Sequence, residues 1–132
     1  MIVYNDDDNY LKFGYEYNWT SPTGGQAFCI LAETNAGSNF QYLDTEHSGL
    51  KRYWVRLTKR GNRYEYAFSA DGKAFIVGGE VEWGDGSPRQ IGILAKNGGN
   101  KDAGELDAAF DFFELRSPVP ARAQPVDAGR TP

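Results

Sequence analysis

One central stretch of the chain, residues 54–75, combines alternating side chains with two turn signals and constrains the fold more than any other. Gly61-Asn62 and Asp71-Gly72 are residue pairs typical of tight turns, because glycine adopts a positive φ at little steric cost. Between them, every second residue from position 64 to 68 is aromatic, which places three rings on one face of a strand. The stretch therefore predicts a three-stranded antiparallel meander of the kind found in β-sandwiches and barrels.

The composition agrees with an all-β fold in one domain. The chain of 132 residues contains 8 Tyr, 8 Phe and 3 Trp together with 16 Gly, which suits short strands joined by many turns. We therefore predict an antiparallel two-sheet β-sandwich with no helix longer than about two turns. Beyond the meander, strands are expected at residues 2–4, 10–17, 27–32, 40–43, 90–95 and 108–115.

Two of these expected strands, residues 27–32 and 90–95, are apolar at most positions, which is typical of strands covered on both faces. Cys29 lies in the first of them and is the chain's one cysteine, so no internal disulfide can form. We interpret it as a small buried apolar side chain rather than a nucleophile. The predicted core consists of Phe28, Ile30, Val55, Leu57, Ile91, Ile93, Phe110 and Phe112.

The charge and hydropathy patterns narrow the classes of partner. With 14 basic and 18 acidic residues the net charge is −4, which argues against nucleic acid because phosphate binding needs a basic surface. The local basic stretch at residues 51–60 is read as a solvated sheet face. No apolar run is long enough to span a bilayer, so no membrane partner is expected, and no signal-peptide core is visible. Residues 117–132, with four prolines, predict a disordered tail after a domain at 1–116.

Four stretches carry a family resemblance when they are taken in chain order. They are IVYNDDDNYLKFG at 2–14, WVRL at 54–57 followed by SADGK at 69–73, IGILA at 91–95, and FDFFEL at 110–115. The set resembles concanavalin A-like lectin/glucanase domains, and within them a bacterial domain of unknown function related to the C-terminal module of family 43 β-xylosidases. The resemblance implies a jelly roll that acts in carbohydrate recognition, or as a non-catalytic accessory of a glycosidase, often outside the cytoplasm.

The chain departs from this family pattern at its first residue. Family domains usually carry several strands before the one that here begins at Met1, so the resemblance implies a sandwich that lacks its first strands. Such a sandwich would leave a sheet edge unpaired, and an unpaired edge invites pairing with another chain. We therefore expect either a homo-oligomer formed through an exposed edge or a marginally stable chain that aggregates at micromolar concentration.

Aromatic side chains in or beside loops are the candidate sugar-binding residues. Trp19, Tyr42 and Trp83 could stack on a sugar ring, while Asn97 and Glu105 could supply directional hydrogen bonds. For the two tryptophans a second interpretation stays open, in which they fold back as lids over the ends of the sandwich. The same aromatic face could also serve a structural, protein-interaction role.

Catalysis and metal binding are the remaining alternatives. Catalytic relatives with this fold carry an E-x-D-x-x-E pattern. Glu105 and Asp107 match its first two acids, but Phe110 stands at the position of the third. A small glycoside hydrolase is therefore the less favoured hypothesis. The run Asp6-Asp7-Asp8-Asn9 raises the possibility of a Ca²⁺ site. Adjacent acids have poor ligand geometry and suit a hairpin turn, so no cofactor is predicted.

Overall fold

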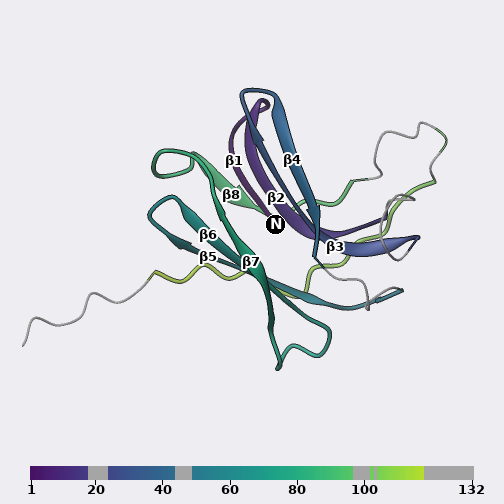
Figure 1. Cartoon of the computed structure of the whole chain (residues 1–132). Helices are drawn as coiled ribbons and strands as arrows, with labels where there is room; N and C mark the ends of the chain where they lie inside the picture. The colour runs from purple at the N-terminus through teal and green to yellow at the C-terminus, as the bar shows by residue number, and fades with distance from the viewer. Residues whose placement is uncertain (18–23, 44–48, 97–101, 103, 118–132) are drawn as a thin grey trace, which may run out of the picture.

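The computed structural model describes residues 1–17, 24–43, 49–96, 102 and 104–117, and these residues form two antiparallel sheets (Figure 1). One sheet has five strands in the order β4-β3-β2-β1-β8, and the other has three in the order β5-β6-β7. No helix occurs in the described part of the chain, and hence none that could cross a membrane. The expected antiparallel two-sheet sandwich is confirmed. The strands are β1 (Ile2–Asp6), β2 (Asn9–Tyr17), β3 (Gln26–Thr34), β4 (Gly37–Tyr42), β5 (Trp54–Arg60), β6 (Arg63–Ser69), β7 (Ile76–Glu82) and β8 (Gln90–Gly92).

The predicted meander is the three-stranded sheet, but its third strand, β7, begins only at Ile76 and runs to Glu82, beyond the predicted end of the stretch. Gly61 and Gly72 have φ of 64° and 73° in the turns after β5 and β6, as the turn signals indicated. The second turn is closed by Asp71, whose Oδ1 accepts hydrogen bonds from the amides of Lys73 (2.8 Å) and Ala74 (2.9 Å) and from the Ser69 hydroxyl (2.9 Å). These bonds hold the chain in position between β6 and β7.

The core lies between the two sheets and is mainly aromatic. The alternating residues of β6, Tyr64, Tyr66 and Phe68, are all buried on the inner face, as predicted. Across the interface the rings of Phe13 and Tyr66 have centroids 5.6 Å apart. The buried cluster comprises Val3, Leu11, Phe13, Phe28, Ile30, Tyr64, Tyr66, Phe68 and Trp83, and Val55 and Leu57 pack against it while partly buried.

Strand β3 is covered on both faces over its first half, as its apolar sequence predicted. Phe28 and Ile30 point into the core, whereas Ala27 and Cys29 point outward, and all four are buried. Burial raises the pKa of the Cys29 thiol to about 12, because the thiolate would lose its hydration. Cys29 is therefore the buried apolar residue that was expected.

For the other four residues of the predicted core, the prediction of burial is wrong. Ile91 and Ile93 are 38% and 41% exposed, and Phe110 and Phe112 are 50% and 62% exposed. The expected strand at 90–95 shortens to β8, and residues 104–117 form no strand. Strand β8 is an edge strand of the five-stranded sheet, and residues 104–117 belong to neither sheet, so these four side chains lack the surrounding layers that bury Phe28 and Ile30.

Two adjacent glycines, Gly78 and Gly79, let β7 pack closely against the core. The register between β6 and β7 shifts between Tyr66 and Ala67, where Gly79 adopts a φ of 152°. A Cβ atom on Gly79 would lie 2.5 Å from the Tyr66 hydroxyl, and one on Gly78 would lie 2.9 Å from the same ring. The bulge therefore makes room for the buried ring of Tyr66.

Candidate functional site

Trp83 follows β7 and closes one end of the sandwich. Its side chain is only 5% exposed and meets the ring of Tyr64 edge-on, with centroids 6.1 Å apart. Its Nε1 donates a hydrogen bond to the carbonyl oxygen of Glu33 (2.7 Å), and its backbone amide donates to the carbonyl of Asn62 (2.9 Å). Trp83 thus has the lid arrangement, and its ring faces are not available for stacking on a sugar.

The other predicted site residues lie elsewhere. Tyr42 ends β4 on the outer face of the five-stranded sheet, opposite Cys29, with its ring edge-on to Phe40. Tyr42 is opposite Cys29 of β3, whereas Trp83 hydrogen-bonds to Glu33 of the same strand, four residues after Cys29. Along the strand alone, this spacing separates Tyr42 from Trp83 by about 13 Å. Glu105 is exposed, beyond the last strand. Trp19 and Asn97 lie outside the described residues.

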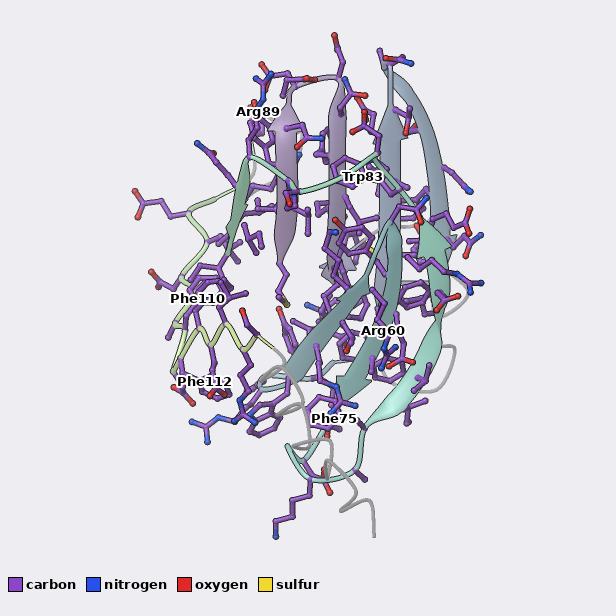
Figure 2. All side chains as sticks on the ribbon, turned by 90° about the vertical axis from the view of Figure 1, so that its left-hand side faces the viewer. Arg60, Phe75, Trp83, Arg89, Phe110 and Phe112 are labelled. Atoms are coloured by element: carbon purple, nitrogen blue, oxygen red, sulfur yellow. The ribbon has the colours of Figure 1, made fainter. Side chains whose placement is uncertain are left out.

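A polar hollow of about 540 Å³ opens at the end of the sandwich that Trp83 closes. Figure 2 shows Trp83 and Arg89 at this end, both on the connection between β7 and β8. The β1–β2 turn and the β3–β4 turn form its other walls. The lining residues are Asn5, Asp6, Asn9, Thr34, Trp83, Gly84, Asp85, Ser87 and Arg89.

Hydrogen bonds hold the Asp6 side of the hollow in place. Oδ1 of Asp6 accepts from the Asn9 side-chain amide (2.8 Å) and from the Asp8 backbone amide (3.1 Å). Oδ1 of Asn9 in turn accepts from the backbone amide of Asn35 (3.1 Å), which lies in the β3–β4 turn. Two turns far apart in sequence are therefore joined through one carboxylate and one amide.

Arg89 brings a positive charge to the same place. Its backbone amide donates to Oδ1 of Asn5 (3.1 Å), which fixes the third loop against β1. The hydrogen bond from Asn9 holds the pKa of Asp6 below its ordinary value, and the Asp8 amide and the Arg89 charge act in the same direction. Asp6 is therefore an anionic acceptor beside a cationic donor.

The rest of the lining adds exposed polar groups. Thr34, Asp85 and Ser87 are exposed side chains that can donate or accept hydrogen bonds to a ligand. Within the described residues no group of three or more His, Cys, Asp or Glu side chains could hold a metal ion. The Asn9 side-chain amide donates a hydrogen bond to Oδ1 of Asp6 within the β1–β2 turn. The arrangement suits a neutral ligand with several hydroxyl groups.

Most of this lining was missed in the sequence, although a signal was present. The turn-forming residues Gly84-Asp85-Gly86-Ser87-Pro88 are typical of an exposed loop, and the run Asp6-Asp7-Asp8-Asn9 is typical of a hairpin turn. What the sequence did not reveal is that the strand topology carries both to one end of the sandwich.

Comparisons of the chain with protein-family models, with curated proteins and with solved structures found no match.

Proposed function

We propose that this chain is a non-catalytic carbohydrate-binding or accessory module of a glycan-processing system, and that the sugar binds in the polar hollow beside Trp83. One observation carries the proposal. Three loops from both sheets bring carboxylates, amides, hydroxyls and a guanidinium to one hollow of about 540 Å³. That volume lies within the usual range for small-ligand sites.

The chemistry of the lining matches a sugar better than an apolar or highly charged ligand. Vicinal hydroxyls can donate to the carboxylates of Asp6 and Asp85 and accept from the guanidinium of Arg89. Asp6 is already oriented by Asn9 and Asp8, so little ordering is required when a ligand binds. Because Trp83 exposes only a few per cent of its surface, hydrogen bonds rather than ring stacking would supply the affinity, which we expect to be weak.

Two features favour binding without turnover. Glycoside hydrolysis needs two carboxyl groups that flank the scissile bond. Phe110 stands where the catalytic pattern requires its third acid. Glu105 lies outside both sheets, where no strand orients its side chain.

A glycan-array screen with the full chain, followed by calorimetric titration of the best ligand, tests the proposal. Asp85→Asn and Arg89→Ala should each weaken binding by roughly tenfold, since each removes a charged hydrogen-bonding group. Asp107→Asn and Lys73→Ala are matched controls that change an exposed acid and an exposed base outside the hollow, and they should bind like the wild type.

Two outcomes would contradict the proposal. If Asp85→Asn and Arg89→Ala both leave the affinity unchanged, the sugar does not bind in the hollow. Steady release of reducing sugar by the pure chain, lost in Glu105→Gln, would establish the glycosidase hypothesis instead.

A further inference from the structure

The connection between β7 and β8, residues 83–89, crosses one end of the five-stranded sheet and forms one long wall of the polar hollow (Figure 2). Strand β7 faces β3 and β4 across the core, since Val81 lines a small cavity together with Ile30 and Asn39. Strand β8 pairs with β1 at the opposite margin of the five-stranded sheet. The connection therefore passes over the ends of β3, β2 and β1 to reach β8.

Hydrogen bonds fasten both ends of this wall to the sheet beside it. At one end, Nε1 of Trp83 donates to the carbonyl oxygen of Glu33 in β3 (2.7 Å). At the other end, the backbone amide of Arg89 donates to Oδ1 of Asn5 in β1 (3.1 Å), and β8 then continues in register with β1. The space between the connection and the strand ends is therefore shut at each end.

The opposite wall of the hollow is continuous as well. Two hydrogen bonds join the β1–β2 turn to the β3–β4 turn: the amide of Asn35 donates to Oδ1 of Asn9 (3.1 Å), and the amide of Ala36 donates to the carbonyl oxygen of Asp8 (3.0 Å). Backbones in hydrogen-bond contact leave no room for a sugar ring between them. A chain of sugars therefore cannot leave the hollow between these two turns.

We propose that the hollow takes the end of a glycan chain and excludes the chain's interior, an inference that rests on the proposed function of sugar binding beside Trp83. A site for the interior of a polymer is open at two ends, so that the chain enters and leaves. Among the residues that the structure describes, this hollow has one mouth, because hydrogen bonds at Glu33 and Asn5 close its two ends. Its floor is the core, since Trp83 belongs to the buried cluster.

The chemistry and size of the hollow agree with a chain end. A terminal sugar ring keeps a hydroxyl that an interior ring has lost to its glycosidic bond. The carboxylates of Asp6 and Asp85, on opposite walls, can accept hydrogen bonds from such hydroxyls. A volume of about 540 Å³ suits a ligand of drug-like size, which corresponds to roughly two or three sugar rings.

Binding can be measured against the number of chain ends at constant polymer mass. Dextran, pullulan, arabinoxylan and galactomannan, which are soluble and neutral, are each offered to the full chain intact and after partial hydrolysis. For a polymer that binds, shortening the chains to about one tenth should raise the protein bound per gram at saturation roughly tenfold, because sites follow the number of ends. Calorimetric titration of its oligosaccharides should show affinity that rises up to roughly two or three rings and then stays constant.

The end that enters the hollow is identified by reducing the oligosaccharides to alditols, which opens the ring at the reducing end. Loss of binding on reduction assigns the reducing end, and unchanged binding with the same dependence on chain length assigns the other end. Either result supports a site for chain ends.

Asp85→Asn separates failure of this inference from failure of the proposed function. If Asp85→Asn binds like the wild type, or if the wild type binds none of these polymers, their oligosaccharides or an array glycan, the proposed function fails and this inference fails with it. If Asp85→Asn binds weakly but hydrolysis leaves the protein bound per gram unchanged, the chain interior occupies the hollow and this inference alone is overturned. Lys73→Ala, at an exposed base outside the hollow, should match the wild type throughout.

Discussion

Phe28 of β3 and Phe68 of β6 stack across the two sheets, with ring centroids 4.2 Å apart and planes inclined by 19°. Both side chains are buried, and Tyr53 meets Phe28 edge-on at 5.6 Å. This pair lies towards the end of the sandwich opposite Trp83, since Phe28 is near the start of β3 and Phe68 is near the end of β6. It anchors the meander to the five-stranded sheet.

Removing the ring of Phe28 should therefore be costly. We expect Phe28→Ala to lower the free energy of unfolding by about 3–5 kcal/mol, because the cavity left between two β-layers cannot collapse completely. Phe110→Ala is the matched control: its ring is 50% exposed, and it should cost less than about 1 kcal/mol. Urea unfolding followed by fluorescence measures both, and similar losses would show that the ring of Phe110 is packed against the core.

Gly79 should not tolerate a side chain. Its φ of 152° strains any other residue, and an added Cβ would lie 2.5 Å from the hydroxyl of buried Tyr66. We expect Gly79→Ala to lower the free energy of unfolding by about 1–3 kcal/mol. Gly86→Ala, where a Cβ meets nothing within 4 Å, should change it little. Equal thermal midpoints for the two variants would contradict the prediction.

Acid should loosen the turn between β6 and β7. The amides of Lys73 and Ala74, with the Ser69 hydroxyl, hold the pKa of Asp71 below its ordinary value of 3.8. A lowered pKa adds stability above the unfolded pKa, and that stability is lost as the pH falls through the folded pKa. Between about pH 5 and pH 2 the wild type should therefore lose more unfolding free energy than Asp71→Asn. Parallel pH profiles for the two proteins would argue against this role.

Cys29 should be chemically silent in the folded protein. With its pKa raised to about 12 and its side chain buried, only about one thiol in ten thousand is ionised at pH 8. Labelling by an aromatic disulfide reagent should be very slow in buffer and rapid in strong denaturant. Fast labelling of the native chain would mean that the outer face of β3 opens to solvent.

Several features of this protein follow from the sequence by itself. The turn pairs at Gly61 and Asp71-Gly72, and the alternation along β6, identified the three-stranded sheet and the face that its aromatic side chains occupy. The apolar run around Cys29 identified a strand with both faces covered. These are local properties, since the side-chain period of a strand and the φ of a turn depend on neighbouring residues.

Other features were decided only when the sheets came together. Ile91 and Phe110 are as apolar as Phe28 but stay exposed, because Ile91 lies in an edge strand and Phe110 lies outside both sheets, whereas Phe28 lies between the sheets. The polar hollow likewise joins Asp6 to Arg89 across more than eighty residues of sequence. No local sequence pattern predicts these long-range contacts. The position of a residue within a strand determines which face of the sheet its side chain points to. The number and order of strands in both sheets determine which other residues it contacts on that face.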